Sequence, residues 1–422
     1  MGAATLRFLH AAAVQLDGPV RQLGAVPRDT LDILASATLT AWERLIDAAV
    51  TQGVDGLFLT GDTFDAEAGS LAADVALRQG LERLAEHDIP AFVIPGWLDP
   101  LPAWSELPAL PDNVTVFDSA WDAAVELTDG GRTIAVIQPV SAETDVSPPE
   151  LDRLRLSGRA KPGAHPPSIG LLWDTPEDTA TVATGEAAAD PRFASLDVLL
   201  CRDAAANATL PLTDAKILRQ SAPQGMTLAE TGSRGATLLQ FDPSGQLTTR
   251  HITLGPVRRE RLTVRLDLAR RRDDVADQML AQLEELPVFP GEQMRLIEWV
   301  FTGTDAAWQR LDFTEAAADE TVQTLLELTD QPGRLRYGHQ AAPLWSGEAD
   351  DREMGELWRD YLSLFDQRPT ATLDELRSLA MELRPQATGA TGPWERWLSQ
   401  LDPAAVAKRS RHYGRRWFAG VR

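Results

Sequence analysis

The chain has 422 residues, 44% of them hydrophobic and 24% charged, which is enough for two or three domain cores of an ordinary globular protein. It has no run of about 18 apolar residues, which argues against a membrane-spanning helix, and its single cysteine, Cys201, excludes an intrachain disulfide and favours the cytoplasm. The net charge of −22 repels phosphate backbones, so any contact with nucleic acid has to be local.

Strands and helices alternate in the N-terminal part of the chain. The apolar run Arg7–Val14 and the stretches Gly56–Thr60 and Ala91–Pro95 are typical of strands, whereas Leu39–Gln52 and Leu71–His87 are typical of helices. This alternation predicts a largely parallel sheet with helices on its faces. Ligands of such sheets bind where the strands end, so the loops after the three strands are the first places to look for a site.

These loops read HAAAVQLDGP, GDTFDA and PGWLDP, and in that order they resemble the metallophosphoesterase (calcineurin-like) family, in particular its SbcD-type DNA repair exonucleases. Further segments carry the resemblance to about residue 265: Ile169–Asp174, Leu196–Ala205, Ala222–Gly232, Ala236–Phe241 and Val257–Val264. The resemblance implies an α/β fold, a sandwich of two mixed β-sheets flanked by helices, over residues 1–256. A small α+β cap over 257–345 and a helical C-terminal region over 346–422 are expected to follow.

The chemistry of the resembled family depends on residues that this chain has mostly lost. Two-metal phosphoesterases hold two cations about 3.5–4 Å apart with Asp, Asn and His side chains. By the resemblance, Asp62 keeps the carboxylate that bridges the cations. The last motif, Gly-His-x-His, becomes Arg202-Asp203-Ala204-Ala205, in which Asp203 could substitute for a lost ligand. The former metal-site positions that no longer ligate are Ala13, Gln15, Trp97, Leu98, Trp173 and Ala205.

The histidines point in the same direction. None of the six has ligand spacing such as H-x-H: His10, His87, His165, His251, His339 and His412. We expect surface or structural histidines, with an unrecognised site as the alternative. No cofactor is expected, and Mn²⁺ is expected only if the chain is an active enzyme.

Bulky side chains stand where ligands would be. Trp97, Leu98 and Trp173 are expected to project into the former metal cavity and fill it, because carboxylates buried without cations are costly. For Asp62 two interpretations stay open. It is either an acidic loop residue bonded to the N–H groups of its own turn, or the residual ligand of a single cation.

The C-terminal part gives weaker signals. Asp273–Leu286 and Phe313–Thr329 are predicted helices, and Met294–Gly303 is a predicted strand of the cap. The end of the chain is basic and aromatic, and its candidate binding residues are Lys408, Arg409, Arg411, Arg415, Arg416 and Trp417. This tail is either a solvated amphipathic segment, a docking segment for a protein partner, or a contact with nucleic acid.

The sequence thus predicts a catalytically inactive protein of this fold that acts as a structural or regulatory subunit in DNA metabolism. The resemblance implies an SbcC-like ATPase as partner, with DNA contacted only indirectly or locally, no membrane, and a homodimer left open. One alternative is an active metal-dependent exonuclease or phosphoesterase with an atypical or mononuclear site formed by Asp62, Asp99 and Asp203. Another is a binding protein that uses the remodelled pocket for an apolar ligand.

Overall fold

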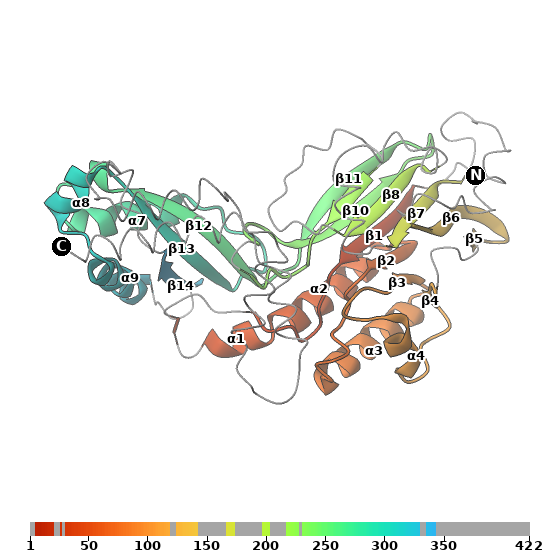
Figure 1. Ribbon diagram of the computed structural model, residues 1–422. Coiled ribbons are helices and arrows are strands. Elements are labelled where there is room, and N and C mark those ends of the chain that lie inside the picture. Colours follow the sequence, from red (N-terminus) through yellow and green to blue (C-terminus); the bar gives the residue numbers. More distant parts are fainter. Residues whose placement is uncertain are drawn as a thin grey trace, which may run out of the picture. The chain divides into compact units, whose positions relative to one another are not determined.

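A computed structural model describes residues 5–20, 26–27, 30–118, 124–141, 166–173, 196–202, 217–227, 230–329 and 335–342. Its first sheet has six strands in the order β11-β10-β1-β2-β3-β4 (Figure 1). The strands β1 to β4 are parallel to one another, and β10 is antiparallel to both β1 and β11. Their bounds are β1 Leu6–Ala12, β2 Gly56–Thr60, β3 Ala91–Ile94, β4 Val114–Val116, β10 Gly235–Phe241 and β11 Leu247–Thr253.

The second sheet has five strands in the order β5-β6-β7-β8-β9. The pair β5 and β6 is antiparallel, and the remaining neighbours are parallel, so this sheet is mixed like the first. Its strands are β5 Val125–Asp129, β6 Arg132–Ser141, β7 Ser168–Trp173, β8 Val198–Arg202 and β9 Ile217–Gln220.

The two sheets pack face to face through one apolar cluster. The first sheet contributes aromatic side chains such as Phe8, Phe58 and Phe92, and the second contributes aliphatic ones such as Ile137 and Leu171. All of these are almost completely buried. Burial of this apolar surface is what holds the sheets together. The predicted sandwich of two mixed sheets is therefore confirmed.

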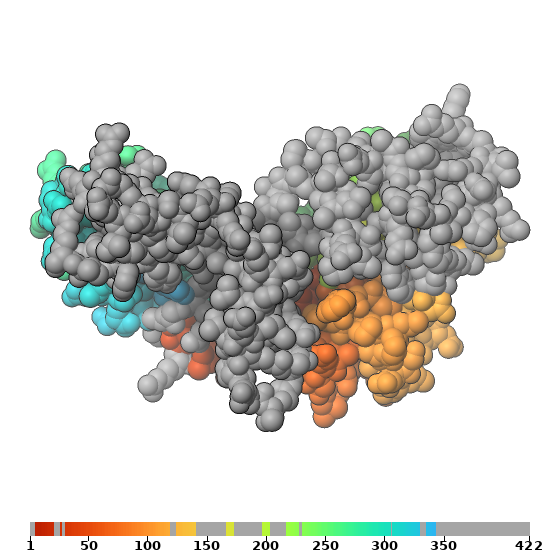
Figure 2. All heavy atoms as spheres, in the orientation of Figure 1, coloured from red at the N-terminus to blue at the C-terminus, as the bar shows by residue number. Residues whose placement is uncertain are grey.

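Helices cover the outer face of the six-stranded sheet (Figure 1). They are α2 Ala37–Gln52, α3 Leu71–Glu86 and α4 Leu101–Glu106, whereas Leu34 of the short helix α1 Leu31–Ala35 packs in a separate apolar cluster with Met226 and Met294. The helices α2 and α3 pack tightly where Gly80 faces Trp42: a Cβ at Gly80 would lie 2.6 Å from the indole nitrogen. That nitrogen donates to the Ala76 oxygen at 2.8 Å. The helix α3 contributes to the orange surface in Figure 2. Its first residue, Leu71, is 76% exposed.

A third sheet, in the order β12-β13-β14, lies in the part of the chain predicted as the cap. Its strands are β12 Val257–Arg265, β13 Met294–Thr302 and β14 Arg336–Ala341, with a 3₁₀ turn at Leu266–Leu268. The helices that occur between them are α7 Asp273–Glu285, α8 Asp305–Leu311 and α9 Glu315–Thr329. This α+β structure agrees with the prediction, and α7, β13 and α9 correspond to the three predicted elements.

The chain divides into two compact units. The first comprises the described residues up to Leu262 together with Leu280–Trp299 and Val322–Gln340, and the second includes Thr263–Met279 and Val300–Thr321. The domain boundaries predicted at residues 256 and 345 stay predictions, and the helical region 346–422 lies outside the described residues.

The second unit has its own aromatic core. The rings of Phe301 and Phe313 lie 4.9 Å apart between centroids, and Trp308 lies 5.9 Å from Phe313. Arg272 donates to the backbone oxygens of Leu311 and Asp312 at 2.9 and 2.6 Å. These bonds tie the start of α7 to the end of α8. Among the described helices, none is long and apolar enough to cross a membrane.

Candidate functional site

The carboxyl ends of β1, β2 and β3 lie side by side because these strands are parallel neighbours. The loops that follow them are joined by backbone hydrogen bonds. The nitrogens of Ala13, Gln15 and Leu16 donate to the oxygens of Gly61, Asp62 and Thr63, each at 2.9 Å. The sheet pairing thus continues for several residues beyond the strands, and it fixes the positions at which the family's ligands would stand.

Several of these residues have an uncommon backbone conformation. Ala13, Gln15 and Asp62 have φ values of 49°, 47° and 52°. The left-handed region costs a non-glycine residue roughly 1–2 kcal/mol, and such strain typically persists where surrounding structure fixes it. Here the backbone bonds between the two loops fix it, and a methyl group and an amide occupy the first two positions.

Asp99 is the anchor of the third loop. It is fully buried, and its Oδ1 accepts hydrogen bonds from the nitrogens of Gly96 and Asp62 at 2.6 and 2.9 Å. Its Oδ2 accepts from the Thr63 nitrogen at 2.8 Å and from the Trp104 indole at 3.2 Å. Burial raises the pKa of the Asp99 carboxyl to about 7, although the backbone donors favour its charged form. Both oxygens of Asp99 therefore accept two hydrogen bonds each from the protein itself.

Asp62 has its two oxygens engaged by different parts of the chain. Oδ1 accepts from the Leu98 nitrogen at 2.8 Å, and Oδ2 forms an ion pair with Nη1 of Arg202 at the end of β8. Asp62 is only 5% exposed. The expectation that its own turn supplies the donor is wrong, because the donor comes from the neighbouring loop. Arg202 was not predicted as a site residue.

Trp97 does not fill the former cavity. Its side chain is 75% exposed, so the expectation that it packs into the site is wrong. The reason is local: Asp99 holds the nitrogen of Gly96 and Asp62 holds the nitrogen of Leu98, which leaves residue 97 at the outside of the turn. Leu98 is half-buried. Its backbone oxygen accepts from the Ala66 nitrogen at 2.9 Å, so it ties together the two loops.

Other predicted site positions lie outside what the structure describes. Trp173 ends β7, but its side chain is outside the described part of the structure. Asp203 and Ala205 lie outside the described residues, as does the whole tail, namely Lys408, Arg409, Arg411, Arg415, Arg416 and Trp417. Predictions for all of these residues stay predictions.

A small pocket remains at the strand ends of both sheets. It is lined by Thr60, Gly61, Ile94, Pro95, Gly96, Leu172 and Arg202. Behind it, Nε2 of the buried His10 lies 2.8 Å from the Thr60 hydroxyl. Burial lowers the pKa of His10 to about 3, so the ring is neutral at physiological pH. This fits the prediction of a structural histidine.

The residues present do not fit a pair of divalent cations. The methyl group of Ala13 cannot ligate, and Asp62 already faces a guanidinium. Within the described ranges, no group of three or more His, Cys, Asp or Glu side chains is arranged to hold a metal ion. The mononuclear alternative also loses a ligand there, because Asp99 is bonded to backbone nitrogens.

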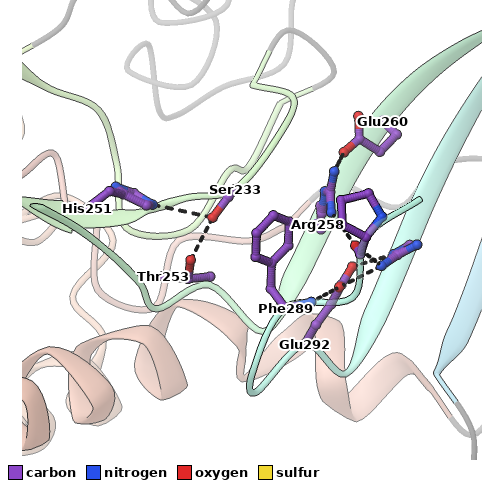
Figure 3. Close-up of polar contacts among 9 residues, drawn as sticks. Ser233, His251, Thr253, Arg258, Glu260, Phe289 and Glu292 are labelled. Atoms are coloured by element: carbon purple, nitrogen blue, oxygen red, sulfur yellow. Dashed lines mark hydrogen bonds and ion pairs between the residues drawn. The ribbon is translucent and has the colours of Figure 1, made fainter. Parts of the chain in front are cut away.

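Two further polar clusters lie away from the strand ends (Figure 3). The Ser233 hydroxyl lies 3.3 Å from Nε2 of His251 and 2.8 Å from the Thr253 hydroxyl. Burial, and then the charge of Arg234, lower the pKa of His251. In the described residues no carboxylate bonds to this ring, so the arrangement lacks the third member of a catalytic triad.

The second cluster in Figure 3 fixes a turn before β13. Arg258 donates to the Pro287 oxygen at 2.9 Å, and its guanidinium lies 4.7 Å from the centre of the Phe289 ring. The Phe289 nitrogen donates to Glu292 at 3.2 Å, and Glu292 pairs with the fully buried Arg295. The ion pairs of Arg258 with Glu260 and of Arg295 with Glu292 hold this turn in place.

No family model matches the chain. Over 133 residues, 31% of the chain, it is 36% identical to the uncharacterized metallophosphoesterase YhaO of Bacillus subtilis (strain 168). The matched segment spans 32% of the length of that protein. Among solved structures, TT1561 of Thermus thermophilus is 12% identical, with a TM-score of 0.30 over 59% of this chain and 99% of that chain. Sequence similarity to YhaO supports the metallophosphoesterase family, whereas the second likeness is too low to carry an argument.

Proposed function

We propose that this chain is a metallophosphoesterase-fold protein that has lost phosphoester hydrolysis and acts as a non-catalytic subunit. The main support is that the loops are well ordered by backbone bonds, although the residues at the expected ligand positions cannot bind a metal. Ala13 and Gln15 keep the left-handed backbone and the hydrogen bonds to the Gly61 and Asp62 loop, yet their side chains cannot replace Asp and His.

The chemistry of the reaction explains why this loss matters. Two-metal hydrolysis needs one cation to generate the attacking hydroxide and both cations to stabilise the charge on the attacking and leaving oxygens. It also needs a histidine near the leaving group for acid catalysis, and that position is Leu98. Asp62 alone supplies none of these functions, so the strand-end loops support a fold rather than a reaction.

Bound metal is the direct test. Purified protein would be loaded with Mn²⁺, dialysed and examined by elemental analysis, with Asp62→Ala as the matched control. We expect near-zero Mn²⁺ in both, and no release of nucleotides from duplex DNA by either. About two Mn²⁺ ions per chain, lost in Asp62→Ala together with nuclease activity, would establish the active alternative instead.

We further propose that the subunit works in DNA metabolism beside an SbcC-like ATPase. Support comes from the resemblance of segments that carry no catalytic chemistry, Ala222–Gly232 and Val257–Val264. Keeping a partner surface while losing the nuclease would account for that pattern. Affinity purification of the tagged full chain from its own host, followed by mass spectrometry, tests it: recovery of such an ATPase is expected, and its absence counts against the proposal.

A further inference from the structure

The ion pair of Arg202 with Asp62 joins the two sheets of the sandwich at the former metal centre. Asp62 follows β2 of the six-stranded sheet, and Arg202 ends β8 of the five-stranded sheet. Their side chains are 7% and 15% exposed. The pocket beside them is lined by residues of both sheets, which places the guanidinium where the strand ends converge.

The chemistry of a guanidinium suits this position. By the resemblance, Arg202 stands at the glycine of the family's Gly-His-x-His motif, and Asp62 stands at the carboxylate that bridges two cations. An arginine always carries a positive charge and presents several N–H donors in a rigid plane, so it can neutralise a carboxylate without being released. Arginine in place of glycine therefore puts a permanent positive charge where the resembled family binds metal cations that can dissociate.

We propose that Arg202 is the resident cation of this centre: it neutralises Asp62, ties the two sheets together, and keeps divalent cations away from the carboxylate. This inference rests on the proposed loss of catalysis and adds its physical cause. Each oxygen of the Asp62 carboxylate already has a partner, the Leu98 nitrogen for one and Arg202 for the other, so a metal ion would have to compete with both. An approaching divalent cation would also meet the like charge of the guanidinium.

A double-mutant cycle tests the tie between the sheets. Asp62→Asn keeps an oxygen for the Leu98 nitrogen, and Arg202→Met keeps an apolar stem, so each change removes mainly the charge. Unfolding in urea is expected to show at least a tenfold coupling, about 1.4 kcal/mol, with the double variant little worse than the poorer single variant. Additive effects would overturn the tie. If Arg202→Met does not fold, the cycle is run with Arg202→Lys, for which a smaller positive coupling is expected.

A pair of rebuilt proteins tests the exclusion of metal. One carries Ala13→Asp, Gln15→His and Trp97→Asn and keeps Arg202, and the other adds Arg202→Gly. Calorimetric titration with Mn²⁺ is expected to give at least tenfold tighter binding to the second protein. Equal affinity, including no binding by either protein, contradicts the exclusion. Failure of these two tests would refute the role of Arg202 but not the proposed loss of catalysis. Mn²⁺ bound to the natural chain would refute the proposed function itself.

Discussion

Gly96→Ala is expected to separate the loop after β3 from the loop after β2. A Cβ at this position would overlap the backbone nitrogen of Asp62 and would lie 2.9 Å from Oδ1 of Asp99. The nearest obstacle is backbone, so relief requires the loops to separate. That movement breaks the two bonds that Asp99 accepts from the other loop, one from the Asp62 nitrogen and one from the Thr63 nitrogen. Above pH 7, where the Asp99 carboxyl is charged, hydrogen bonds to it contribute about 1.5–3 kcal/mol each, so the expected loss of stability at pH 8 is about 3–6 kcal/mol.

Urea denaturation followed by circular dichroism would measure this loss, and Gly69→Ala provides the control. Gly69 has a φ of 57° and open space where a Cβ would be, so alanine there meets only the left-handed backbone. That strain costs roughly 1–2 kcal/mol. If Gly96→Ala destabilises the protein no more than Gly69→Ala does, the loops do not depend on the Asp99 anchor as described.

Three further outcomes follow from individual side chains. Ala13→Gly should raise the free energy of unfolding by about 0.5–1 kcal/mol, because glycine relieves the left-handed strain; a loss in urea denaturation would contradict this. Trp97→Ala should change the free energy of unfolding by less than about 0.5 kcal/mol, because its indole is exposed. Trp104→Ala should lower it by about 3–5 kcal/mol, because that indole is buried and donates to Asp99. Thermal denaturation of both variants would compare the two losses. His339 should make folding sensitive to acid, because burial lowers its pKa to about 3, well under the unfolded value of 6.5. Its stabilising contribution is present above pH 6.5 and falls as the pH decreases toward 3. Between pH 6.5 and 5 the free energy of unfolding of the natural chain should therefore decrease more steeply than that of His339→Gln, by up to about 1.4 kcal/mol per pH unit. Parallel curves of unfolding free energy against pH would refute the assignment.

The contacts of His339 explain why it stays neutral. The Trp299 indole donates to Nδ1 at 3.2 Å, so Nδ1 carries no proton. The Thr329 hydroxyl donates to the Leu325 oxygen at 2.8 Å and is therefore the acceptor for Nε2 at 3.1 Å. A second proton on Nδ1 would face the indole N–H, and the pair would have to separate.

Local pattern was enough for the strands that position the site. The prediction Gly56–Thr60 coincides with β2, because a short apolar run between a helix and Gly-Asp leaves little choice. The hairpin of β5 and β6 was missed, although Gly130 and Gly131 provide the two residues of positive φ that such a turn requires. Attention to that glycine pair would have found it.

The site was harder to predict because its decisive contact is distant in sequence. Arg202 and Asp62 are 140 residues apart, and a comparison of motifs reveals missing ligands but not the contacts that replace them. A useful signal was the charge of the replacement: arginine at a glycine position beside a surviving carboxylate indicates compensation. Trp97 was misjudged for a related reason, since size predicts cavity filling only if the backbone lets the side chain turn inward.

The geometry of the strand-end loops does not depend on metal ligands. Backbone bonds join the Ala13 and Gln15 loop to the Asp62 loop, and Asp99 joins the Asp62 loop to Gly96. Ligand side chains can therefore be replaced one at a time while the loops keep their shape, provided that the charge of Asp62 remains compensated. Under the proposed function, this separation of scaffold from chemistry accounts for sequence similarity to a metallophosphoesterase in segments that hold the fold. In the same proposal, the guanidinium of Arg202 removes the need for a cation at Asp62.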